Sequence, residues 1–133
     1  FVGKRREASH YRSIREREEK FQGLPTLATK NPMPQKGNLV DMKLVSGCTV
    51  ISIDYYKRMR AGFRNIFGGN VSSYESLVDR ARREAILRMK ENCPNASQVI
   101  NLRIETSSVF KNSGRGSIGS IEVIAYGTAV TFQ

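Results

Sequence analysis

The sequence has few residues of the kinds that hold metal ions or form disulfide frameworks. It contains no tryptophan, a single histidine, His10, and two cysteines, Cys48 and Cys93, in 133 residues. A tetrahedral zinc site needs four converging ligands, which usually come in close pairs such as CxxC. The sequence therefore excludes a protein-only zinc site of this type within one chain. The two distant thiols are expected to be buried or inert, and reduced as in a cytoplasmic protein.

The motifs of the common enzyme classes are also missing. There is no GxSxG and no phosphate-binding loop with a lysine, and the domain from residue 38 onward has no histidine and no paired-carboxylate motif within a short span. Tyr74, Glu105 and Arg64 could converge only through folding. We therefore expect a protein that is not an enzyme.

Long apolar runs are absent as well. No stretch of about 18 apolar residues occurs, so no segment is predicted to span a bilayer. The first residues, FVGKRRE, do have the composition of the cytoplasmic flank of a transmembrane helix, because an apolar end is followed at once by Lys4, Arg5 and Arg6. One hypothesis is therefore a cytoplasmic domain that a preceding segment tethers to the inner membrane.

Basic residues are in excess, with 22 lysines and arginines against 12 acidic residues and a net charge of +10. Such an excess is typical of proteins that bind nucleic acids or anionic membrane surfaces. Here it is spread over the chain rather than collected in a stripe, and no aromatic-rich strand of an RNA-binding module is visible. Nucleic acid is therefore not favoured, while an anionic membrane surface stays a candidate partner.

Residues 1–37 and 38–133 differ in composition and predict an appendage followed by one domain. The segment from Lys4 to Phe21 is rich in charged, helix-forming residues and has few apolar ones. It predicts a charged helical stalk that is solvated and makes weak tertiary contacts. The segment that follows contains prolines, which favour an extended linker: Pro25, Pro32 and Pro34.

Alternating apolar and polar residues in the domain predict four strands. Val40, Met42 and Leu44 alternate with charged residues and predict a half-buried first strand, which Gly47 interrupts. The other three predicted strands are Thr49 to Tyr56, Gln98 to Ser107 and Ile121 to Phe132. Gly127, in the last of them, marks a bulge or a close backbone contact.

One long helix separates the second and third predicted strands. Ser72 and Glu75 stand in the relation of a capping box at its start, and Pro94 supplies its end. Its charged residues, including Arg80 and Arg83, are expected to face solvent. Its apolar residues form a stripe that we expect against the sheet: Leu77, Val78, Ala81, Ala85 and Met89. The order predicts an α+β fold, in which an antiparallel sheet of about four strands carries one main helix on one face.

The stretch before this helix holds the candidate ligand-binding residues. Two successive glycines, Gly68 and Gly69, allow a sharp turn into the helix, whose amino-terminal amide groups can hold a small anion. The candidates for such an anion or ligand site are Arg64, Gly68, Gly69, Asn70 and Tyr74. The alternative is that the glycines merely permit the turn and close packing.

Several segments resemble the YbjQ-like family of small bacterial and archaeal domains, to which a heavy-metal-binding label is attached. They are VSGCTV at Val45 to Val50, AGFRNIFGG at Ala61 to Gly69, YGTAV at Tyr126 to Val130, and the tyrosine pair Tyr55 and Tyr56. The resemblance covers residues 38–133. It implies a β-α-β-β subunit that assembles with copies of itself into a ring, most often a pentamer.

A ring also has a physical motive. A sheet with a single helix leaves one face and its edges uncovered, and identical copies can cover both. The strands that we expect near such contacts are Val99 to Val109 and Ile121 to Phe132.

The resemblance leaves the ligand open. In a ring, each copy could contribute one oxygen ligand to a metal ion near the axis, and Asp54 and Glu105 are the candidates for that role. A second hypothesis is a basic oligomer that binds nucleic acid or an anionic membrane surface. Its candidate residues are Arg58, Arg60, Arg64, Arg82 and Arg83.

Overall fold

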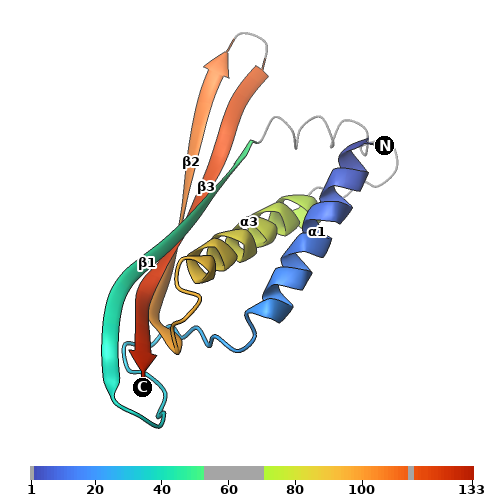
Figure 1. Cartoon of the computed structure of the whole chain (residues 1–133). Coiled ribbons are helices and arrows are strands. Elements are labelled where there is room, and N and C mark those ends of the chain that lie inside the picture. The colour runs from blue at the N-terminus through green and yellow to red at the C-terminus, as the bar shows by residue number, and fades with distance from the viewer. Residues whose placement is uncertain (1, 53–70, 114–115) are drawn as a thin grey trace.

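The structure, a computed structural model, describes residues 2–52, 71–113 and 116–133. Its elements in chain order are α1 (Val2–Lys20), β1 (Leu39–Ser52), α3 (Val71–Glu91), β2 (Gln98–Ser113) and β3 (Gly116–Phe132). The strands form one antiparallel sheet in the order β1-β3-β2. Figure 1 shows three layers, in which α3 lies between the sheet and α1. The predicted α+β class is confirmed.

The described part of the chain has three strands where the sequence predicted four. β1 runs without a break through Gly47, which the sequence analysis took as an interruption. A Cβ atom at Gly47 would overlap the backbone nitrogen of Met89 and lie 2.7 Å from the carbonyl carbon of Arg88. The glycine therefore lets α3 approach the strand closely. Of the predicted second strand, Thr49 to Ser52 belongs to β1 and the rest lies outside the described residues.

The prediction of which residues of β1 are buried was wrong at its start. Val40, Met42 and Leu44 are exposed, whereas Val45 and Thr49 are buried on the face that α3 covers. The first six residues of β1 are all exposed. Met42 and Leu44 lie on the face that points away from α3, and α3 covers the other face only from Val45 onward, so the alternation shows which residues share a face but not which face is covered.

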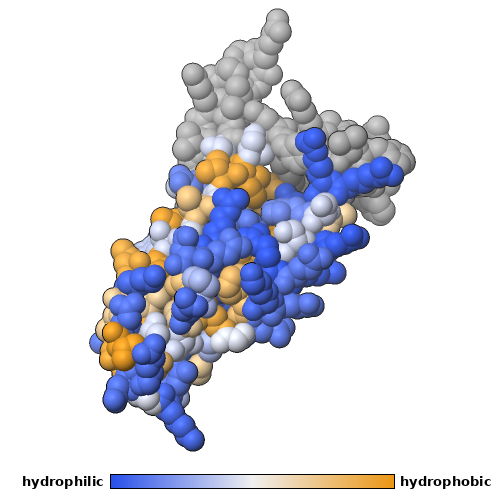
Figure 2. Space-filling view, in the orientation of Figure 1, coloured by the Kyte–Doolittle hydropathy of each residue, from blue (hydrophilic) through white to orange (hydrophobic). Residues whose placement is uncertain are grey.

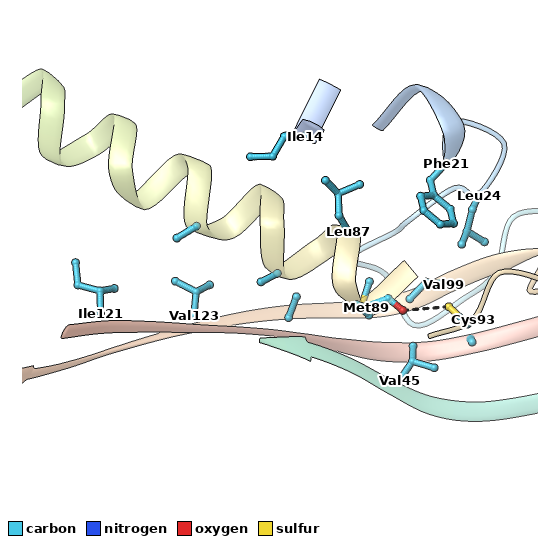
Figure 3. Packing of buried hydrophobic residues seen from close by; sticks show 14 residues of the cluster. Ile14, Phe21, Leu24, Val45, Leu87, Met89, Cys93, Val99, Ile121 and Val123 are labelled. Atoms are coloured by element: carbon cyan, nitrogen blue, oxygen red, sulfur yellow. Dashed lines mark hydrogen bonds between the residues drawn. The ribbon is translucent and has the colours of Figure 1, made fainter. Parts of the chain in front are cut away.

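α3 has two buried sides. Ala81, Ala85 and Met89 are buried in the cluster that packs on the sheet, as predicted, and the small alanines allow close approach. Figure 3 shows Leu87 pointing away from the sheet, on the side where Ile14 of α1 lies. Both of these side chains belong to the same buried cluster. The core therefore continues through α3 into the third layer.

α1 is not the solvated stalk that the sequence predicted. A helix is present at the predicted place, but Ile14 is 0% exposed and Phe21 is also buried. Arg80 of α3, expected in solvent, is buried with its guanidinium 5.6 Å from the ring centre of Tyr11. α1 is thus packed as the outer layer of the fold.

The segment after α1 runs along the outer edge of β2. The backbone N–H of Leu27 donates to the carbonyl of Val99 at 2.8 Å, and the N–H of Val99 donates to the carbonyl of Pro25 at 2.9 Å. Further along, the side-chain amide of Gln98 accepts from the N–H and donates to the carbonyl of Met33, both at 2.9 Å. The extended linker therefore covers this edge of the sheet.

Gly127 makes the close backbone contact that the sequence predicted. A Cβ atom there would lie 2.9 Å from the side chain of Val99 and 3.0 Å from the carbonyl oxygen of Ile100. The register of β2 against β3 shifts between Ile100 and Arg103, opposite this glycine. The irregularity is thus in β2, and the glycine makes room for it.

The β2–β3 hairpin extends past the end of β1. β1 ends at Ser52, which pairs with Ser120, whereas β2 and β3 stay paired as far as Ser113 and Gly116. Figure 1 shows this two-stranded arm projecting beyond the rest of the sheet. Within the described ranges no third strand lies beside the end of this arm, and a lone pair of strands is marginally stable in water, so contact with another molecule there would add stability.

Candidate functional site

The sheet face that points away from α3 carries apolar side chains in contact with solvent. Leu44 is 77% exposed and Val50 is 62% exposed, and Cys48, on the same face of β1, lies opposite Ile124 of β3. We call Met42, Leu44, Cys48, Val50 and Ile124 the bare face. Single exposed apolar residues are ordinary, but a row of them on neighbouring strands is typical of a contact surface.

The outer edge of β1 is partly occupied. In the described part of the chain, the sheet order leaves β1 with a strand neighbour on one side only. However, Nη1 of Arg88 donates to the carbonyl of Cys48 and Nδ2 of Asn92 donates to the carbonyl of Ser46, both at 2.8 Å. These side chains block the middle of the edge against a further strand. The bare face is therefore the stronger candidate for contact with another molecule.

A pocket of about 360 Å³ lies at the start of β1, beside the end of β3 and the loop after α3. This volume is in the range of sites for small ligands. Lys43 contributes a cation and Asp41 an anion, and neither forms an ion pair within the residues that the structure describes. The lining residues are Val40, Asp41, Lys43, Cys93, Pro94, Asn95, Ala96, Thr131 and Gln133. A small anion could bind there through Lys43.

The two thiols differ in environment. Cys93 is buried, its sulfur lies 3.5 Å from the carbonyl oxygen of Met89, and burial raises the pKa of its thiol. It fits the prediction of an inert cysteine. Cys48 is a free, exposed thiol on the bare face, which the sequence analysis did not foresee.

A cluster of charges joins α1 to α3. The nearly buried carboxylate of Glu84 accepts hydrogen bonds from Arg17 at 3.0 and 2.8 Å and from Arg88 at 3.0 Å. Nε2 of His10 lies 3.3 Å from the same carboxylate. Burial by itself raises the pKa of Glu84, but the hydrogen bonds from Arg17 and Arg88 outweigh it and hold the pKa below its ordinary value. Arg17 also donates to Glu91 at 2.6 Å, so this cluster fastens α1 to α3.

A second ion pair also connects α1 to α3. The guanidinium of Arg83 donates two hydrogen bonds of 2.7 Å to the carboxylate of Glu18. These bonds are the main reason why the pKa of Glu18 is lowered. The sequence placed Arg83 in a solvent-facing basic patch, but its guanidinium is ion-paired with Glu18 of α1. Local sequence gave no signal of this pairing, because the partners are 65 residues apart.

Most of the predicted site residues cannot be placed. Asp54, Arg58, Arg60, Arg64, Gly68, Gly69 and Asn70 lie outside the described residues. Tyr74 lies in the first turns of α3, where its side chain is outside the description. Arg82 is exposed on α3, and Glu105 is exposed on β2, opposite Ile124 of the bare face. The predicted anion and metal sites therefore stay predictions.

The donor set can be tested for a metal ion within one chain. No group of three or more histidine, cysteine, aspartate or glutamate residues lies together in the described ranges. Glu105 is a single carboxylate, and a site built on it would need oxygen or nitrogen donors from elsewhere.

Comparison with known proteins gives consistent matches. A family model described as "Putative heavy-metal-binding" matches residues 26–133, a range that leaves out α1. A UPF0145 protein of Hahella chejuensis is 39% identical over 103 residues, 76% of this chain and 92% of the relative. The UPF0145 protein DET1617 of Dehalococcoides mccartyi is 38% identical over 95 residues, 70% of this chain and 85% of the relative.

Among solved structures, a protein of unknown function of the DUF74 family from Pediococcus pentosaceus covers 84% of this chain and 100% of its own. The two share a TM-score of 0.42 and 15% sequence identity.

Proposed function

The chain belongs to the YbjQ family of UPF0145 proteins, and we propose that it is a non-enzymatic domain that assembles with copies of itself into a ring and binds a metal ion or a small anion. The subunit number that we propose is five. The family description supports a binding role, and the names of the relatives do not mention an enzymatic reaction.

The bare face is the observation that carries the assembly. Its side chains sit on neighbouring strands, and Leu44 and Val50 are each more than half exposed. Burying a Leu or Val side chain is worth about 1.5 to 3 kcal/mol, so covering several of them in each copy is a substantial driving force. No charged residue occurs in β1 from Leu44 to Ser52, so the strand lacks the guards that usually keep sheets apart.

The β2–β3 arm supports the same proposal. It continues beyond Ser52, the last residue of β1, and among the described residues no third strand lies beside its far end. Contact with a neighbouring copy would supply the packing that a lone hairpin lacks. The arm and the bare face together offer two surfaces that identical subunits can share in a closed ring.

The proposed metal site needs ligating side chains from more than one copy. Since the described residues of one chain bring together no group of three metal ligands, a metal ion would require side chains from several copies. Glu105 lies opposite Ile124 of the bare face and would supply one carboxylate per copy, with Asp54 as the other proposed donor. For a small anion, the pocket at Lys43 is one candidate, and the proposed residues are Arg64, Gly68, Gly69, Asn70 and Tyr74.

The alternative of a basic patch that binds nucleic acid or an anionic surface through the proposed arginines is less well supported. The structure describes two of these arginines. Arg83 is ion-paired with Glu18, and only Arg82 is exposed. No helix among the described residues is long and apolar enough to cross a membrane. A cytoplasmic location and a tether to the inner membrane remain proposals.

The test replaces residues of the bare face and measures mass in solution. Leu44→Glu combined with Val50→Glu should convert the oligomer to a single copy in light scattering, because neither carboxylate can be buried without a partner and Val50 lies opposite another acid, Glu122. Met33→Glu is the matched control, since Met33 is also apolar and exposed but lies on the linker. If the double variant keeps the mass of the parent, the bare face is not the assembly surface.

Ligand binding is tested on the assembled protein. Elemental analysis after dialysis and calorimetric titration with divalent metals and with inorganic phosphate should show binding to the oligomer. Glu105→Ala should abolish metal binding and leave phosphate binding intact. If no ligand gives heat and the elemental analysis finds no metal, the proposed ligand binding is wrong. The proposed assembly is tested separately by the mass measurement above.

A further inference from the structure

The outer side of α1 carries arginines that form no ion pair among the residues that the structure describes. Arg5, Arg6 and Arg12 are exposed, and within the described residues none of them takes part in an ion pair or hydrogen bond. The basic residues on the inner side behave differently, since Arg17 is held by Glu84 and Glu91. The pairing of inward-facing charges therefore leaves an unbalanced positive surface outside.

The geometry of the helix places these guanidinium groups on a flat surface. Arg5 and Arg12 are seven residues apart, which is two helical turns or about 10 Å along the axis on the same side. Ala8 and Ser9 lie between them and are exposed, so no large side chain stands in the way. Figure 2 shows hydrophilic residues over the side of the molecule where α1 lies. A planar array of phosphate groups could approach this surface without obstruction.

Among the exposed side chains that the structure describes, the excess of positive charge is in the first half of α1, where the side chain of Glu7 lies outside the description. In the second half, the exposed cations Arg15 and Lys20 are matched by the exposed acids Glu16 and Glu19. The amino-terminal end of a helix also carries the positive end of its dipole. An anionic surface would therefore be attracted more strongly to the first half than to the second.

We propose that the first half of α1 is a docking surface for an anionic membrane, with Arg5, Arg6 and Arg12 contacting the lipid phosphates. A guanidinium group donates two parallel hydrogen bonds to phosphate oxygens, which suits headgroups at a surface. None of the exposed α1 side chains that the structure describes is a large apolar one. The contact that the described residues offer is therefore electrostatic, and it weakens as salt is added.

The chemistry of this surface favours a membrane over nucleic acid. Proteins that bind single strands stack bases on exposed aromatic rings. The aromatic residues of the described part of α1 and its end are turned inward, because Tyr11 packs on Arg80 and Phe21 is buried. The inference does not depend on the ring, although several copies on one face of an oligomer would add avidity.

The experiment measures sedimentation of the full chain with vesicles. The probes are vesicles of phosphatidylcholine alone and of phosphatidylcholine mixed with an equal amount of phosphatidylglycerol. The test variant is Arg5→Gln with Arg12→Gln. The control is Lys30→Gln with Lys36→Gln, which removes the same charge from exposed positions on the linker. Circular dichroism and solution mass establish that each variant keeps the fold and assembly of the parent.

The parent should bind the mixed vesicles and not the neutral ones, with affinity that falls as salt rises. Each arginine near an anionic surface contributes about fivefold, so the test variant should bind at least about 25-fold more weakly, and the control within about threefold of the parent. The proposal is overturned if the parent does not bind the mixed vesicles at low salt, or if both double variants weaken equally. Binding to a DNA duplex that the test variant loses, without binding to vesicles, would overturn it in favour of nucleic acid.

Discussion

Ile14→Ala tests whether α1 is an integral layer of the fold. The side chain of Ile14 is 0% exposed and belongs to the same buried cluster as Leu87 and Phe21. The substitution removes its three outer carbon atoms and leaves a cavity between α1 and α3. If α1 were solvated, the same change would alter almost nothing.

The magnitude follows from the burial. Each buried methylene is worth about 0.8 kcal/mol, so the transfer contribution alone is about 2.4 kcal/mol. The cavity adds to it, and measured losses for Ile→Ala in protein cores are about 2 to 5 kcal/mol. We expect a loss of about 2 to 4 kcal/mol in the free energy of unfolding, measured by urea denaturation at one protein concentration, since the proposed assembly would make stability depend on concentration.

Arg12→Ala is the matched control on the same helix. Arg12 is exposed and two residues from Ile14, and its replacement should change the free energy of unfolding by less than about 0.5 kcal/mol. A loss for Ile14→Ala that is no larger than the loss for this control would refute the packing of α1 on α3.

The remaining predictions concern the strand, the ion cluster and the thiols. Gly47→Ala should destabilise the protein severely, because the added methyl overlaps the backbone of α3, whereas Gly23→Ala, with nothing within 4 Å, should be nearly neutral in thermal melts; equal melting temperatures would contradict this. Since the pKa of Glu84 is held below its ordinary value of 4.5, the stability that it contributes is present above about pH 4.5 and is lost as the pH falls through the lower folded-state pKa. Glu84→Gln should therefore lower the melting temperature at pH 7 and lose less on acidification than the parent, and parallel curves would count against the cluster. With a thiol reagent, Cys48 should react in the single-copy variant and be protected in the oligomer. Cys93 should react in neither protein until it unfolds, and fast labelling of Cys93 in the native protein would contradict its burial.

Sequence patterns predicted the elements whose partners are close in the chain. Apolar residues at helical spacing, such as Ala81, Ala85 and Met89, predicted α3, and the helix ends before Pro94, as predicted. The start of β1 was misread because alternation shows only which residues share a face. Which of the two faces is covered depends on the side of the sheet on which α3 packs, and that is a property of the whole fold.

The packing of α1 could not be read from its own composition. The helix is strongly charged, a pattern that locally is typical of a solvated helix. Its partners for Arg17 and Glu18 are Glu84 and Arg83, between 65 and 67 residues away, so the neutralisation of these charges is a property of the tertiary structure. The spacing of Ile14 and Phe21 was the available signal, since residues seven apart lie on one side of a helix.

The candidate site was predicted less completely. The proposed anion residues Arg64, Gly68, Gly69 and Asn70 fall outside the described part of the chain, so they stay a prediction. The need for a covered sheet face was predicted from the ratio of strands to helices, and exposed Leu44 and Val50 agree with it. The particular residues were not predicted, because the sequence analysis assigned Leu44 to the buried side.

The mass of the full chain in solution tests the central claim most directly, because the bare face and the β2–β3 arm are argued to need further copies. Native mass spectrometry and light scattering over a range of dilutions should both give a closed oligomer, with five copies as the expected number. A compact single copy that stays soluble at every concentration would contradict the account.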